Sequence, residues 1–211
     1  MFKITKNEPD FFSKAKSKVV LASVSDAWRD PEIEAIRPHL REHILHHEQN
    51  GLCVYCEKKI DSHRDNSNID HFKLKAGHLF PEKTLDYTNL VVSCNTEGRC
   101  STHKDSKIKF KNEYEKIVNP IHENPDEYFD YLLTGEIVPI SDNEKANFTI
   151  DIFKLGRNEN EGLSQTRKQL SETLKHLSNL SLEDIYENFG NEYQSFIRII
   201  YPKLQQQGAT Q

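Results

Sequence analysis

The N-terminal part of the chain shows one clear helical pattern. Residues 1–30 have little periodicity, and no regular element is expected there. After Asp30 and Pro31, which suit an N-cap and a first helical position, apolar residues recur every three or four positions. These residues are Ile33, Ile36, Leu40, Ile44 and Leu45. The pattern predicts a helix that Pro38 can kink and that Gly51 ends.

Further apolar patterns lie in the second half of the chain. Residues 118–140 are interrupted by prolines and a glycine, which predicts a loop, a helical turn and a short strand pair. Residues 143–155 look helical, and the leucine stripe over residues 163–177 predicts another amphipathic helix.

A last helix is expected before the C-terminus. Ser181 and Asp184 resemble a capping box, so the helix should begin there and end near Pro202. The polar tail of residues 205–211 is expected to be frayed.

Composition excludes several classes of protein. The chain has 211 residues and a net charge of -5, and it has no apolar run near the ~20 residues of a membrane span. The first residues lack a leader pattern, so no membrane association and a cytoplasmic location are expected. A protein that coats nucleic acid alone is usually basic, so this chain can carry only a local basic patch or must borrow affinity from a partner. The best candidate is the segment from Arg99 to Lys111, although such a segment can also be a solvated helix face.

The four cysteines lie together in the sequence. Cys53 and Cys56 are separated by two residues, and Cys94 and Cys100 by five. Two such pairs can supply the four thiolates of a tetrahedral zinc site, whereas four free buried thiols are the alternative. A site closed by four thiolates has no open position, so the zinc would be structural.

Residue types suited to acid–base chemistry gather in the same region. Asp70 and His71 follow Ile69 in a segment that looks like a strand, Asn89 opens the apparent strand "NLVVSC", and His103 begins a lysine-rich helix. The two cysteine pairs flank these segments. A zinc site there would therefore hold a β-hairpin against a helix and bring Asp70 close to His103.

This ordered set resembles the HNH nucleases. The stretches that match are "CVYC", "IDHF", "TNLVVSC" and "CSTHK", within residues 52–110. The resemblance implies a ββα-metal core and a metal-dependent endonuclease that hydrolyses phosphodiester bonds. His71 would be the general base. Asp70 and His103 would hold a catalytic Mg²⁺ or Mn²⁺, and Asn89 would orient His71 or brace the loop between the strands.

The last metal ligand departs from the usual HNH form. The ligand histidine usually follows the second cysteine of the second pair directly, and here that position is Ser101. Motif identity favours His103, whereas the helical phase favours Asp105, which shares a face with Ser101. We expect His103 to be the ligand, with Asp105 as the second candidate or as an additional ligand.

The flanking segments are similar to a narrower family, the PtuB-like HNH proteins of Septu and retron-associated anti-phage systems. That resemblance implies a defence effector that acts with an ABC-type ATPase (PtuA-like), and in some systems with a reverse transcriptase and its DNA–RNA hybrid. DNA is the default substrate and RNA an alternative. The competing hypotheses are a non-catalytic zinc-ribbon adaptor that binds nucleic acid or protein, and an RNA-directed toxin nuclease.

The expected fold is α+β, with a zinc-stapled ββα-metal HNH core embedded in a mainly helical chain. Residues 1–51 would form an N-terminal helical region and residues 52–112 the nuclease core with its four-cysteine site. Residues 113–211 would form a mostly helical C-terminal region that can dock a partner.

Overall fold

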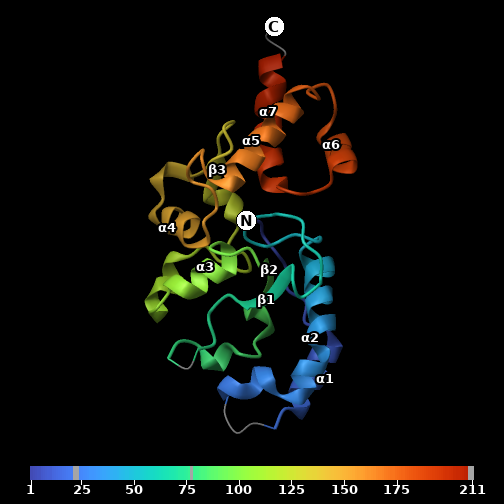
Figure 1. Ribbon diagram of the computed structural model, residues 1–211, viewed down its shortest axis with the longest axis vertical. Helices are drawn as coiled ribbons and strands as arrows, with labels where there is room; N and C mark the ends of the chain where they lie inside the picture. Colours follow the sequence, from blue (N-terminus) through green and yellow to red (C-terminus); the bar gives the residue numbers. More distant parts are fainter. Residues whose placement is uncertain (21–23, 77, 209–211) are drawn as a thin grey trace.

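The structure is a computed structural model that describes residues 1–20, 24–76 and 78–208. The helices are α1 Asp10–Lys18, α2 Pro31–His43, α3 Cys100–Lys107, α4 Glu144–Phe153, α5 Gly162–Lys175, α6 Leu182–Phe189 and α7 Gln194–Gly208. The strands are β1 Ser67–His71, β2 Leu90–Cys94, β3 Phe129–Tyr131 and β4 Ile137–Pro139. Figure 1 shows α1 and α2 at one end of the molecule, the β1–β2 pair and α3 in the middle, and α5, α6 and α7 at the other end.

The strands form two small antiparallel pairs. In the first pair Ser67 lies opposite Cys94 and His71 opposite Leu90, and in the second pair β3 lies beside β4. Helices and small sheets thus occur together, which agrees with the predicted α+β class.

The N-terminal helix α2 follows the predicted pattern. Asp30 caps it, because its Oδ1 accepts a hydrogen bond of 2.9 Å from the backbone N–H of Glu32. Pro38 lies inside the helix, and a π-helical turn follows it at Ile44–Glu48. The expectation that residues 1–30 hold no regular element was wrong, because α1 lies there. Its buried residues Phe12 and Ala15 make too short a stripe to stand out as a period.

The C-terminal helices differ from the prediction in number. The capping box at Ser181 and Asp184 is confirmed, with hydrogen bonds of 3.0 Å in both directions between backbone N–H groups and side chains. However, α6 ends at Phe189 with Gly190 as its C-cap, and α7 continues through Pro202 instead of ending there. Residues 205–208 belong to α7 rather than to a frayed tail, and residues 209–211 lie outside the described residues.

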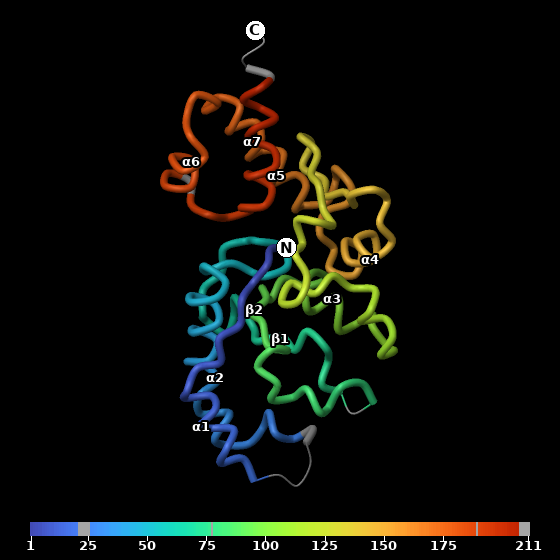
Figure 2. The backbone as a smooth tube through the Cα atoms, turned by 180° about the vertical axis from the view of Figure 1, so that it is seen from behind, coloured from blue at the N-terminus to red at the C-terminus, as the bar shows by residue number. Residues whose placement is uncertain are grey.

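Strand β2 has buried side chains on both of its faces. Leu90 and Val92 pack with Phe12, Ile33 and other residues of α1 and α2. Val91, which points to the opposite face, belongs to a second core that extends to the C-terminal helices. Figure 2 shows α1 and α2 on one side of β2 and α3 on the other. The β1–β2 pair is therefore fixed from two directions.

The β3–β4 turn requires a glycine. Gly135 has φ +93°, and a Cβ atom there would lie 2.0 Å from the backbone oxygen of Ser164. Arg167 of α5 donates a hydrogen bond of 2.6 Å from Nε to the Gly135 oxygen. The leucines of α5 face inward as well, since Leu163 and Leu174 are buried in the large core.

The division of the chain into regions 1–51, 52–112 and 113–211 remains a prediction.

A buried carboxylate connects the C-terminal helices with the first cysteine pair. Glu57, the residue after Cys56, accepts a hydrogen bond of 2.8 Å at Oε2 from the backbone N–H of Ser195 in α7. Its backbone oxygen accepts another, of 3.1 Å, from the N–H of Tyr193.

Across the described part of the chain, no helix is both long and apolar enough to cross a bilayer.

Candidate functional site

The four cysteines converge on one buried point. Their sulfur atoms all lie within 4.8 Å of one another, with 3.9 Å between Cys53 and Cys100 and 3.9 Å between Cys56 and Cys94. Tetrahedral zinc with bonds of about 2.3 Å places its sulfur ligands about 3.8 Å apart, so the cluster has the right size for such an ion. Hydrogen bonds from the Cys100, Cys53 and Cys56 side chains lower the pKa of the Cys94 thiol, which favours the thiolate that a metal binds.

Local backbone geometry explains how the sequence builds this cluster. The first pair lies in a turn that the N–H of Glu57 closes with a 2.9 Å bond to the oxygen of Cys53. Glu57 and Cys100 both have the left-handed backbone that L-residues seldom adopt, with φ of 63° and 53°. These turns aim the sulfur atoms inward.

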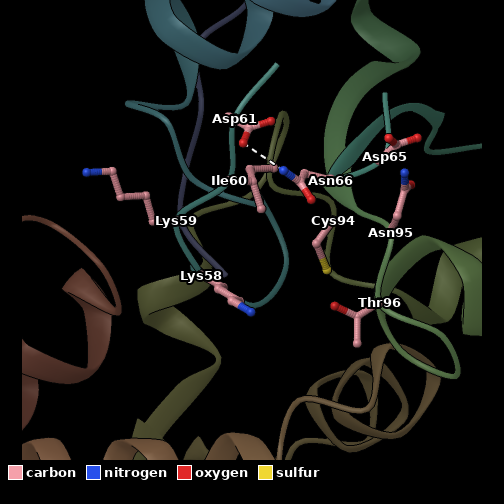
Figure 3. Close-up of a pocket in the computed structure, with 9 residues that line it drawn as sticks. All are labelled: Lys58, Lys59, Ile60, Asp61, Asp65, Asn66, Cys94, Asn95 and Thr96. Atoms are coloured by element: carbon pink, nitrogen blue, oxygen red, sulfur yellow. Dashed lines mark hydrogen bonds between the residues drawn. The ribbon is translucent and has the colours of Figure 1, made fainter. Parts of the chain in front are cut away.

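A pocket of about 550 Å³ lies beside the cluster. Figure 3 shows Cys94 on its wall, with Lys58 and Lys59 toward one side and the hydrogen-bonded pair Asp61 and Asn66 toward another. None of the predicted acid–base residues lines this pocket. The predicted acid–base residues therefore lie outside this pocket.

A smaller pocket, of about 280 Å³, is lined by three of the five residues predicted for catalysis and for the catalytic metal ion. It lies where β1 ends against α3, and Asp70, His71, Ser101 and Asp105 line it together with Trp28, Asn68, Ile69, Leu74, Lys75 and Thr102. We call this pocket the acidic pocket. Neither His103 nor Asn89 lines it.

His71 is held in one orientation at the end of β1. Its Nε2 atom lies 2.9 Å from the backbone oxygen of Thr84, and Trp28 packs edge-on against the ring at 4.6 Å. Because a carbonyl oxygen only accepts, Nε2 carries the proton and Nδ1 keeps its lone pair. Burial lowers the pKa of His71 to about 4, so the ring is neutral at pH 7.

Asp70 is buried beside His71, and both of its oxygens have protein partners. Oδ2 accepts a hydrogen bond of 2.5 Å from the Tyr55 hydroxyl, and Oδ1 lies 3.2 Å from the ammonium group of Lys104. Tyr55 stands between Cys53 and Cys56 and stacks on Phe153 of α4. The cysteine turn therefore positions the carboxylate of Asp70 through Tyr55.

Lys104 was missed by the sequence reasoning, which counted it among the exposed lysines of a basic patch. Its side chain is 0% exposed. Besides Asp70, its ammonium group contacts Asp105 Oδ1 at 2.7 Å and the backbone oxygens of His71 and Phe72 at 2.9 and 3.1 Å. Attraction to the two carboxylates outweighs burial and raises the pKa of Lys104, which keeps it charged. The signal was available, since residues 101, 104 and 105 share one helix face.

The two candidates for the last metal ligand point in different directions. Asp105 lines the acidic pocket, where burial and the neighbouring Asp70 raise its pKa to about 6. The Nδ1 atom of His103 lies 2.9 Å from the backbone oxygen of Ile152 in α4. The structure therefore brings Asp70, His71 and Asp105 together and places His103 against α4. Within the described residues, no cluster of three His, Cys, Asp or Glu ligand atoms forms around Asp70.

Asn89 braces the segment that follows β1. Its Oδ1 accepts a hydrogen bond of 2.7 Å from the N–H of Lys73, and its Nδ2 donates to the backbone oxygens of Lys73 and Lys83 at 2.9 and 3.2 Å. Of the two roles considered for Asn89, this geometry matches the brace. A catalytic role for it stays a prediction.

Comparison with known proteins places this chain near the PtuB-like proteins. Septu protein PtuB of Bacillus thuringiensis is 27% identical over 125 residues, covering 57% of this chain and 42% of that protein. The protein named "Retron Vc95 putative HNH endonuclease", of Vibrio cholerae serotype O1 biovar El Tor, is 31% identical over 134 residues, covering 60% and 61%. Septu protein PtuB of Bacillus mycoides (strain KBAB4) is 24% identical over 167 residues, covering 67% and 54%.

These relatives confirm the resemblance to PtuB-like HNH proteins that the motifs indicated. The chain spans between 42% and 61% of the length of these curated relatives. No family model matches the chain.

Proposed function

We propose that this protein is a metal-dependent HNH endonuclease that hydrolyses phosphodiester bonds at the acidic pocket. The orientation of His71 is the observation that carries this proposal. A neutral imidazole with its lone pair on Nδ1, fixed by a carbonyl oxygen on Nε2, is suited to take a proton from a water molecule. The pocket that it lines also holds two carboxylates.

The protein groups around His71 have complementary roles. After proton uptake, the Thr84 oxygen and the buried Asp70 carboxylate stabilise the imidazolium. Asp70 and Asp105 would hold the divalent ion, since Mg²⁺ and Mn²⁺ accept one or two carboxylates together with water. When bound, that ion neutralises the phosphoryl oxygens and the departing oxygen. Asn89 and Tyr55 keep the segments that carry Asp70 and His71 in place.

The remaining parts of the proposal concern assembly. The cysteine cluster would bind a structural zinc, within a nuclease core of residues 52–112 flanked by helical regions 1–51 and 113–211. The names of the relatives support a role in a Septu or retron system. The proposal adds that the protein is the effector of such a defence system and acts in the cytoplasm. An ABC-type ATPase would deliver DNA, or RNA as the alternative. In retron systems a reverse transcriptase with its DNA–RNA hybrid would restrain the complex.

Metal-dependent cleavage tests the proposal. Zinc-loaded protein, alone and with the proposed ABC-type ATPase partner, is incubated with plasmid DNA, single-stranded DNA and RNA in Mg²⁺, Mn²⁺ or EDTA. We expect cleavage only with the added ion, and a loss of ~10²–10⁴-fold in His71→Ala. His63→Ala is the matched control, because His63 is exposed and does not line the acidic pocket. Equal activity in both variants would overturn the nuclease assignment.

One observation favours the adaptor hypothesis. Both oxygens of Asp70 already have protein partners, and the Lys104 ammonium group contacts both Asp70 and Asp105. A non-catalytic protein would keep this arrangement as a structural ion pair. That hypothesis predicts that His71→Ala leaves every activity of the protein unchanged. An RNA-directed toxin would instead cleave RNA alone in the same experiment.

A further inference from the structure

Beside the acidic pocket lies a second, larger hollow with a different character. It has a volume of about 570 Å³, and Phe72, Lys73, Phe80, Lys111 and Tyr114 belong to its lining. The segment Phe72–Lys75 separates the two pockets, because Leu74 and Lys75 line the acidic pocket while Phe72 and Lys73 line the larger one. The two pockets therefore adjoin, and this segment is the wall between them.

Lysines and an aromatic ring meet on this surface. The ammonium groups of Lys73 and Lys111 lie over the ring of Phe80, at 5.1 and 5.3 Å from its centroid. Within the described part of the chain, neither of them nor Lys75 forms an ion pair with a carboxylate. Among the described residues these three lysines thus form no ion pair, although Asp105 lines the acidic pocket with Lys75, and Glu115 and Glu123 line the larger hollow with Lys73 and Lys111.

Phe110, which precedes Lys111 in the chain, has an unusually exposed aromatic side chain. It is 68% exposed, while its backbone N–H donates a hydrogen bond of 2.7 Å to Glu113 Oε2. The same carboxylate accepts a bond of 2.8 Å from the N–H of Lys109. The turn is thus fixed, and it presents an apolar ring to solvent beside Lys109 and Lys111.

The support for this surface is rigid. The N–H of Leu74 donates a hydrogen bond of 3.0 Å to the hydroxyl of Tyr114, and the rings of Tyr114 and Phe80 meet edge to face at 5.2 Å. Asn89 fixes Lys73 from the other side. The lysines therefore project from a backbone that is already in place.

We propose that this surface binds one unpaired strand of nucleic acid and leads it to the acidic pocket. The binding surface consists of Lys73, Lys75, Phe80, Phe110 and Lys111. Its lysines would contact phosphates, and the exposed ring of Phe110 would stack on a base. A duplex offers phosphates but keeps the faces of its bases covered, so it cannot use Phe110 in this way. The inference rests on the proposed function, since it names the substrate form of the same site.

Binding without cleavage tests the inference. Full-length protein carrying His71→Ala is titrated into fluorescent oligothymidine of about 20 nucleotides, longer than the ~4–16-nucleotide sites of typical strand-binding folds. The same measurement is made with a duplex of equal length. We expect Phe110→Ala to weaken binding of the single strand about tenfold and to change duplex binding little. Leu132→Ala, another exposed apolar residue, is the matched control.

The lysines are tested through the salt dependence of binding. Lys73→Ala with Lys111→Ala should weaken binding and reduce the slope of log affinity against log salt by about 1.4, which corresponds to two single-strand phosphates. Lys14→Ala with Lys175→Ala removes two exposed lysines of α1 and α5 and should leave the slope unchanged. If the variants of the binding surface have the same affinity and salt dependence as their controls, the proposal is wrong. It is also wrong if the protein does not bind the single strand at low salt.

Two other outcomes separate the possible explanations. If Phe110→Ala releases a co-purifying protein while oligonucleotide binding stays the same, the surface is a protein interface and the proposal is wrong. Because the titration needs no cleavage, a wild-type protein that binds as expected but hydrolyses nothing would overturn the proposed function and leave this surface in place.

Discussion

The ammonium nitrogen of Lys104 lies 3.2 Å from Asp70 Oδ1 at a position with no access to solvent. The same group contacts Asp105, so one fixed positive charge neutralises part of the negative charge of the acidic pocket.

We predict that Lys104→Met destabilises the protein by about 3–5 kcal/mol, because it leaves two carboxylates without their buried partner. Denaturant unfolding measures this change in the free energy of unfolding.

The same variant reports on the cation site. With Lys104 removed, Mn²⁺ should restore stability more strongly than in the wild type, since it can replace the lost positive charge. Lys107→Met is the control, because Lys107 lies on the same helix and is exposed. A Lys104→Met protein that is as stable as this control would contradict the role described here.

A second prediction distinguishes Asp105 from His103. Asp105→Ala should abolish metal-dependent cleavage and weaken Mn²⁺ binding, because Asp105 lines the acidic pocket. His103→Ala should keep both activities and lose about 0.5–1.5 kcal/mol of stability with the hydrogen bond to Ile152. Isothermal titration with Mn²⁺ and a cleavage assay check the pair. The opposite pattern would return the ligand role to His103.

The cysteine cluster gives a third prediction. Purified protein should carry about one zinc ion per chain, and Cys53→Ser or Cys94→Ser should yield insoluble or unfolded protein, because binding of such a zinc is part of the folding free energy. Elemental analysis and circular dichroism measure the two effects. Well-folded protein that contains no metal would end the zinc assignment.

Glu123 gives a prediction about pH. Although partial burial acts to raise it, hydrogen bonds from Lys145, the N–H of Asn119 and Tyr128 lower the pKa of this carboxyl. A lowered pKa means that the charged form stabilises the fold above about pH 4.5 and that this contribution is lost as the pH falls through the folded pKa.

The test compares Glu123→Gln with the wild type. The variant should be less stable by about 1 kcal/mol at pH 7, a figure reduced for the partial exposure of the ion pair. The difference should shrink toward pH 3 as the wild-type carboxyl becomes protonated. Urea unfolding at both pH values checks this, and a constant difference would show that the charge of Glu123 has no part in it.

Much of the secondary structure followed from apolar spacing and caps. The Asp30 cap, the strand of "NLVVSC" and the capping box at Ser181 are all local signals, and the structure contains each of them. Helix α1 and the division between α6 and α7 were not predicted. In α1 the apolar stripe is short, whereas α6 ends on a local signal that the sequence analysis missed, the C-cap residue Gly190 with φ 76°.

The candidate site was predictable only as far as sequence motifs extend. The motif placed Asp70 and His71 at the end of a strand and the four cysteines in one cluster. It did not reveal the contacts of Tyr55 and Lys104 with Asp70, which lies 15 and 34 residues away along the chain, although the helical phase already put Lys104 on the same face as Asp105. Such contacts depend on the tertiary fold. Helical phase was nevertheless a better guide than motif identity to which side chains of α3 line the pocket.

The hydrogen bond between Glu57 and Ser195 makes the first cysteine turn and the C-terminal helices thermodynamically dependent on each other. If α7 separated from the first cysteine turn, Oε2 of the buried Glu57 carboxylate would lose its backbone donor, and the Met1 ammonium group at Oε1 would remain as its ion-pair partner. Local opening at that point is therefore costly. The amide protons of Tyr193 and Ser195 should exchange with solvent only when the region around the cysteine cluster unfolds, so that cluster and the C-terminal helices form one cooperative unit.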